Sequence, residues 1–264
     1  HLSTEAMTVQ WVRDATGRFA QRPHYSPAEL DAECERVMRE FLVGLHGEFR
    51  LPVPTDDLTR LIERDAAQLN PYADLAAEGP NVEGLTVFRR GQKPVVSIAK
   101  ALAEDERRSN RYRTTLTHEF GHVHFHDFVF NLEQTQPMFA DFEDEPWRRQ
   151  LARLARQPAG AHEERQSCKR DTIEDAAEYD WMEWQAGYAC GALLMPITPL
   201  TERVGELKEQ LGLVGAIPLS TPGARQLIAA VASAFEVSQE AARVRLTKLN
   251  HLTAQATGAG FTFV

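Results

Sequence analysis

The chain has 264 residues, of which 43% are hydrophobic, so it can bury a core of ordinary size as one large or two small domains. Its net charge of −9 disfavours a general phosphate-binding role, and direct nucleic-acid binding is therefore not expected. No apolar run reaches the ~18 residues of a membrane span, and the N-terminus lacks the apolar segment of a signal peptide. The three cysteines are widely spaced and give no disulfide framework, so we expect a reducing, cytoplasmic setting.

Residues 1–25 are expected to form an N-terminal arm of irregular structure that packs on the rest of the chain through its aromatic rings. The first part of this arm, residues 1–6, precedes Met7 and has the appearance of a remnant of protein expression. Residues 26–264 are interpreted as a single domain with a loop-rich insertion and a C-terminal helical part.

Two helices and a small sheet are predicted in the first part of this domain. Ser26 and Pro27 have the residue types of a helix start, and an apolar stripe at helical spacing follows them. A second helix is predicted over residues 55–67. Residues 84–88 and 94–98 favour strands separated by a turn, so we expect a small antiparallel sheet.

The most informative stretch is His-Glu-Phe-Gly-His at residues 118–122, an HExxH pattern on a predicted helix. Residues four apart lie about 40° from each other around a helix, so the imidazoles of His118 and His122 can hold one metal ion, for which zinc is the expected choice. Glu119 lies on the same side, where its carboxylate can act as a general base on water without being a ligand. The pattern also arises by chance, so it does not establish a metal site alone.

Two further histidines follow on the same helix. His124 falls on the far side from His118, toward solvent or another wall of the protein. His126 faces the correct way but lies about 12 Å along the axis from His118, too far to share one ion through Zn–N bonds of ~2 Å. We therefore expect His126 to support the site from outside the ligand set.

A catalytic zinc usually has three protein ligands, so a third donor is expected further along the chain. Residues 131–175 are charged and weakly periodic, and we interpret them as a loop-rich insertion with mostly solvated carboxylates. The stretch from Glu183 to Pro196 favours a helix with Glu183 at the head of its apolar stripe and Gln185 pointing away. Lys and Arg are absent from residues 181–202, which makes zinc a better partner for Glu183 than a local salt bridge; the alternative is a glutamate favoured by the helix dipole.

These patterns together resemble the ImmA/IrrE family of metallo-endopeptidases. The resemblance rests on the HExxH helix with His126 four residues on, then Glu183-Trp-Gln-Ala, and finally a Leu-Leu-Met-Pro ending at Pro196. It covers most of the domain. The chain departs from the family at Gly187 and Ala189, where Asn and Phe are common, and in its long insertion.

The resemblance implies a zinc ion held by His118, His122 and Glu183, with Glu119 as the catalytic acid/base. It also implies a small α+β protease fold, here mainly helical, with the small antiparallel sheet preceding the HExxH helix. The protein would then be a zinc-dependent endopeptidase, and the substrate typical of the family is a helix-turn-helix transcriptional repressor.

Residues 200–252 contain three predicted helices, and the last two resemble a helix-turn-helix. Ser238 caps a helix that carries Arg243, Arg245 and Lys248, which would suit DNA. The alternative, favoured by the acidic net charge, is that the apolar residues of these helices close the core of the catalytic domain.

Two rival functions remain open. One is a DNA-binding or sensor protein whose metal site is structural or regulatory, and the other is an inactive scaffold. Cys168 or Cys190 could act as a redox switch near the metal, although a buried, inert thiol is the favoured interpretation.

Overall fold

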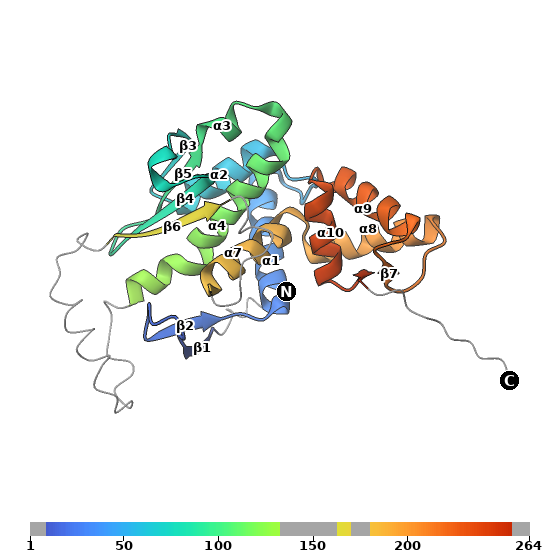
Figure 1. Cartoon of the computed structure of the whole chain (residues 1–264), viewed down its shortest axis with the longest axis horizontal. Coiled ribbons are helices and arrows are strands. Elements are labelled where there is room, and N and C mark those ends of the chain that lie inside the picture. Colours follow the sequence, from blue (N-terminus) through green and yellow to red (C-terminus); the bar gives the residue numbers. More distant parts are fainter. Residues whose placement is uncertain (1–8, 133–162, 170–179, 255–264) are drawn as a thin grey trace. The chain divides into compact units, whose positions relative to one another are not determined.

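The structure is a computed structural model that describes residues 9–132, 163–169 and 180–254 (Figure 1). The described residues fall into two compact units, the first drawn from 1–33 and 54–190 and the second from 34–53 and 191–264. The N-terminal arm and the HExxH helix both belong to the first unit.

The described elements make a mainly helical α+β fold, as predicted. The helices are α1 (Pro27–His46), α2 (Thr55–Asp65), α3 (Lys100–Ala103), α4 (Ser109–Leu132), α7 (Trp181–Leu194), α8 (Ile197–Gln210), α9 (Pro222–Phe235) and α10 (Gln239–Lys248). The strands are β1 (Gln10–Arg13), β2 (Gln21–His24), β3 (Gln68–Ala73), β4 (Val82–Arg89), β5 (Val95–Ala99), β6 (Glu163–Lys169), β7 (Ile217–Pro218) and β8 (Leu252–Thr253). Within the described ranges, no helix combines the length and the apolarity needed to cross a membrane.

The N-terminal arm is more regular than predicted, because β1 and β2 pair antiparallel as a hairpin. The carboxylate of Asp14 organises the connection between them, accepting hydrogen bonds from the hydroxyl of Thr16 at 2.8 Å and from the backbone N–H of Phe19 at 3.0 Å. The expected packing through aromatic rings is confirmed. The ring of Trp11, for example, meets the edge of Phe128 on α4 at a centroid distance of 5.9 Å.

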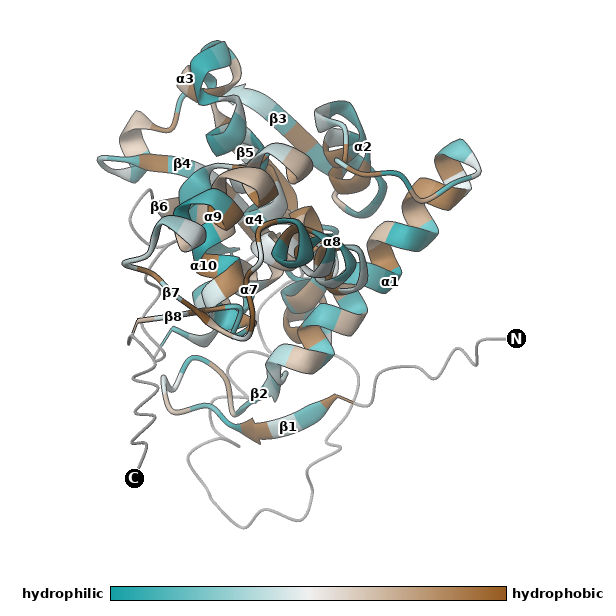
Figure 2. Cartoon of the chain, turned by 90° about the vertical axis from the view of Figure 1, so that its right-hand side faces the viewer, coloured by the Kyte–Doolittle hydropathy of each residue, from teal (hydrophilic) through white to brown (hydrophobic). Residues whose placement is uncertain are grey.

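Helix α1 begins as predicted. The hydroxyl of Ser26 accepts a hydrogen bond from the backbone N–H of Glu29 at 3.3 Å, and the Glu29 carboxylate accepts one in return from the backbone N–H of Ser26 at 2.7 Å. This reciprocal cap satisfies N–H groups that the first helical turn leaves unpaired. Figure 2 shows hydrophilic and hydrophobic segments alternating along α1, the pattern of a helix with one apolar stripe. Helix α2 ends at Asp65, two residues before the predicted end.

The main sheet has the strand order β3-β5-β4-β6. The predicted antiparallel pair is confirmed as β4 and β5, but β3 joins β5 in parallel, so the sheet is mixed. Strand β6 corrects the prediction for the insertion, because Glu163–Lys169 pairs antiparallel with β4 and places Cys168 opposite Gly84. Its polar sequence carries no apolar alternation, and it is a strand because β4 offers it an edge. Residues 133–162 and 170–175 of the insertion lie outside the described residues.

Successive residues of β4 face opposite sides of this sheet. Leu85 and Val87 pack in an apolar cluster on one side, with Ala73, Leu75 and Val82. Gly84 and Thr86 lie on the other side and contact side chains of α4. The sheet is therefore the wall against which the HExxH helix is packed.

In the second unit, α9 and α10 form the predicted helix-turn-helix, with Glu236 in the left-handed conformation (φ 50°) at the turn and Ser238 capping α10. Its buried apolar residues include Leu227, Ile228, Val231, Phe235 and Leu246. Arg245 is also buried and donates to the backbone carbonyl of Met195 at 3.2 Å, while Arg243 donates to Glu240 at 2.8 Å. Arg243 and Arg245, two side chains considered for DNA, thus make contacts within this unit.

Candidate metal centre

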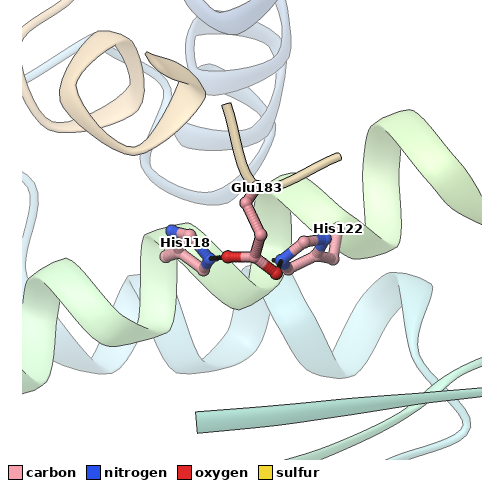
Figure 3. Close-up of side chains that lie close together, drawn as sticks. All are labelled: His118, His122 and Glu183. Carbon is pink, nitrogen blue, oxygen red and sulfur yellow. Dashed lines mark hydrogen bonds and ion pairs between the residues drawn. The ribbon is translucent and has the colours of Figure 1, made fainter. Parts of the chain in front are cut away.

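Helices α4 and α7 approach each other closely at the centre of the HExxH pattern. A Cβ atom added to Gly121 would lie 3.0 Å from the Cα of Ala186 and 3.3 Å from its carbonyl oxygen. A side chain at residue 121 would push the two backbones apart by a few tenths of an ångström, so glycine permits this close approach. The close approach brings Glu183, which lies one turn before Ala186 on α7, over the two histidines of α4 (Figure 3).

We predict that Gly121→Val will weaken metal binding and lower the free energy of unfolding by about 1–3 kcal/mol, because overpacking forces α4 and α7 apart. Urea unfolding and metal titration measure the two effects. Gly205→Val is the matched control, since Gly205 is an exposed glycine inside α8 with no atom within 4 Å of an added Cβ. Equal metal affinity in the Gly121 variant and the wild type would show that the close approach does not set the site.

Three buried side chains predicted as metal ligands meet in this structure (Figure 3). The Nε2 atoms of His118 and His122 lie 3.1 Å apart. One carboxylate oxygen of Glu183 lies 3.1 Å from Nε2 of His118, and the other lies 3.2 Å from Nε2 of His122. Two imidazoles and a carboxylate within such distances are a donor set for a divalent metal ion. Glu183 also stands in the first turn of α7, so the helix-dipole interpretation and the ligand interpretation apply together.

The pKa values of Glu183 and His118 are set by burial and by the groups around them. Burial alone would raise the pKa of Glu183, but the two imidazoles outweigh it and hold that pKa well below its usual range. Burial alone would lower the pKa of His118, and its contacts with Cys168 and Glu183 instead raise it well above the ordinary value. Without metal, the site therefore favours a carboxylate beside a protonated imidazole.

This ion pair gives a prediction for the metal-free protein. The raised pKa of His118 contributes stability that is present below its unfolded pKa of about 6.5 and is lost as pH rises through the folded value. The lowered pKa of Glu183 contributes stability that is present above about 4.3 and is lost as pH falls through the folded value. We expect the melting temperature of metal-free protein to fall as pH rises above about 6.5, and saturating metal to remove that fall. A flat metal-free profile would contradict the assignment.

Glu119, the predicted general base, is fully buried between α4 and the sheet. Its Oε2 accepts a hydrogen bond from the hydroxyl of Thr86 at 2.5 Å. Its Oε1 has no hydrogen-bond partner among the described residues and lies against Gly84, where an added Cβ would be only 2.2 Å away. Burial raises the pKa of Glu119, although the two nearby imidazoles partly oppose this. A carboxylate with a raised pKa can both take and return a proton near neutral pH.

Strand β6 adds a cysteine to the surroundings of the centre. The donor atoms of Cys168, His118 and Glu119 lie within 4.8 Å of one another. Burial raises the pKa of the Cys168 thiol to about 11, which favours the inert thiol over a reactive thiolate. Cys190 is also buried, and it accepts a hydrogen bond from the hydroxyl of Thr117 at 3.3 Å.

The two remaining histidines of α4, His124 and His126, lie outside the candidate ligand set. Nδ1 of His126 lies 3.1 Å from Nδ1 of His122, so His126 contacts a candidate ligand, as expected. Burial and the neighbouring His122 lower the pKa of His126 well below its ordinary value. His124 lies on another wall, with its Nε2 atom 2.8 Å from the carboxylate of Glu33.

The prediction that Gln185 points away from the site is wrong. Its Oε1 lies 3.1 Å from Nε2 of His126, and its side chain is buried. The prediction assumed that the far side of α7 faces solvent, but this helix is covered on several sides and its polar side chains also face protein. The roles of Thr86 and Gly84 were also missed, because they depend on neighbours distant in the sequence.

No protein-family model matches the chain, and no curated protein matches it either. The resemblance to the ImmA/IrrE family therefore stays a prediction. A functional proposal has to be built on the geometry and chemistry of the metal centre.

Proposed function

We propose that the chain is a zinc-dependent endopeptidase. In this proposal His118, His122 and Glu183 hold the ion, and Glu119 is the general base. The observation that carries the proposal is that three buried donors converge while a second buried carboxylate, that of Glu119 beside His118, lies outside this set of three.

The donors suit zinc in number, type and separation. Tetrahedral zinc with bonds of ~2.0–2.1 Å places neighbouring ligand atoms about 3.3 Å apart. The separations here are 3.1 Å between the two imidazole nitrogens and 3.1 and 3.2 Å from them to the carboxylate oxygens. Structural zinc sites usually have four protein ligands, whereas three protein donors are typical of catalytic sites.

When bound, zinc would polarise a substrate carbonyl and lower the pKa of a water molecule toward neutrality. Glu119 would take a proton from the attacking water as its oxygen forms a bond to the carbonyl carbon. The same carboxyl group would pass that proton to the leaving nitrogen as the peptide C–N bond breaks. Thr86 would hold Oε2 in place during both transfers, leaving Oε1, which has no hydrogen-bond partner among the described residues, to carry the proton.

The proposed substrate is a protein in the cytoplasm, specifically a helix-turn-helix repressor, and this part rests on the family resemblance alone. The test has two stages. Elemental analysis of the purified protein should find zinc, and co-expression with products of neighbouring genes should reveal one that is cleaved. A protein that neither contains nor binds zinc would overturn the proposal. Cleavage of a neighbouring gene's product by the wild-type protein, but not by Glu119→Gln, would support it.

A further inference from the structure

A line of hydrogen-bond contacts leads from the N-terminal hairpin to the metal centre. The side-chain N–H of Gln185 donates to the backbone carbonyl of Pro23 on β2 at 3.0 Å. Oε1 of Gln185 lies 3.1 Å from Nε2 of His126, and Nδ1 of His126 lies 3.1 Å from Nδ1 of His122. All four residues belong to the first unit.

The first contact determines the direction of every later one. A backbone carbonyl only accepts, so the amide of Gln185 must turn its nitrogen to Pro23 and its oxygen to His126. Because that oxygen also only accepts, Nε2 of His126 must carry the hydrogen. His126 is fully buried, and no carboxylate of the described residues is within hydrogen-bond distance of it, so its ring is neutral and its Nδ1 presents a lone pair.

The last contact then fixes the proton on the candidate ligand. A lone pair on Nδ1 of His126 requires that Nδ1 of His122 carries a hydrogen. The Nε2 atom of His122, which faces His118 and Glu183, is therefore the nitrogen at which a proton and a metal ion exchange. Free imidazole places its proton on either nitrogen, so this choice is imposed by the surroundings.

We infer that Gln185 and His126 are positioning residues, which use the Pro23 carbonyl to hold His122 in the Nδ1–H tautomer and so present its Nε2 atom to the metal. The inference rests on the proposed function, since it concerns the same metal ligand. It adds a role for the N-terminal hairpin, whose backbone supplies the acceptor at which the line of contacts begins.

The tautomer of His122 is measured directly by long-range ¹H–¹⁵N NMR of histidine-labelled, metal-free protein. We expect the hydrogen of His122 on Nδ1, with Nε2 unprotonated. A hydrogen on Nε2 overturns the inference. Because this measurement needs no variant and no zinc, it decides the inference even if zinc binding, and with it the proposed function, fails.

Zinc affinity, measured by competition with a chelator, gives the second readout. Gln185→Met and His126→Phe keep the side-chain volume but remove the hydrogen bonds, and each should weaken zinc binding about 10–100-fold. His126→Gln should restore much of the affinity, because an amide can accept from His122 and donate to Gln185.

Tyr188→Phe is the matched control. Tyr188 lies on α7, as Gln185 does, and donates a buried hydrogen bond of 2.8 Å to Asp31. The change removes this bond without altering the contacts from Pro23 to His122, so zinc affinity should stay close to the wild-type value. Wild-type affinity in Gln185→Met, or an equal loss in Tyr188→Phe, would overturn the inference.

Discussion

Replacing Glu119 with Gln will leave zinc bound and reduce peptide-bond cleavage by about 10²–10⁴-fold, the usual contribution of a general acid or base. The amide has nearly the volume of the carboxylate and can still accept the hydrogen bond from Thr86, but it cannot take a proton from water. The rate of substrate cleavage at saturating zinc, together with the zinc content of the variant, measures the effect.

Glu33→Gln is the control for this prediction. This change removes a carboxylate of α1 that contacts His124. His124 is on α4, as Glu119 is, but lies outside the metal centre, so the cleavage rate should stay close to wild type. Full cleavage by Glu119→Gln would exclude Glu119 as the base, and loss of zinc in that variant would show that Glu119 is a ligand instead.

Replacing Glu183 with Gln will lower zinc affinity by at least about 100-fold, because it removes a charged ligand and not merely a supporting hydrogen bond. The two imidazoles hold the pKa of Glu183 well below its usual range, so this carboxylate stays charged under conditions that protonate most others. A neutral amide oxygen lacks that charge. Chelator competition measures the affinity, and cleavage should be lost at limiting zinc.

Glu183→Gln should also change how the free energy of unfolding depends on pH. Metal-free wild-type protein should lose stability as pH falls through the depressed pKa of Glu183, whereas Glu183→Gln should lack this component. Glu163→Gln, which weakens partly exposed ion pairs with Arg89 and Arg165 away from the metal centre, serves as the control for both measurements. Tight zinc binding by Glu183→Gln would show that another residue completes the ligand set.

Features set by neighbours in the sequence could be predicted well. The cap of α1 is formed by Ser26 and Glu29, three residues apart, and the spacing of His118 and His122 on one helix already placed both imidazoles on one side. Glu183 could be selected because its helix lacks a local cationic partner.

Features that depend on contacts between residues distant in the sequence could not be predicted. Strand β6 is polar along its length, and only pairing with the edge of β4 makes it a strand. Gln185 was assigned to the wrong side because periodicity shows which faces of a helix differ, but not how many of them are buried. The role of Gly121 depends on its contact with Ala186 of α7, which the sequence does not reveal.

The carboxylate of Glu119 fills the space beside Gly84, so this position of β4 has no room for a side chain. A side chain at position 84 would occupy the space of the Glu119 carboxylate, with the nearest oxygen 2.2 Å from the new atom. Natural selection for activity should therefore keep this strand position free of side chains even while the strand around it diverges. We predict that a profile demanding glycine there, in addition to HExxH, will separate chains with the proposed catalytic site from chance occurrences of the shorter pattern.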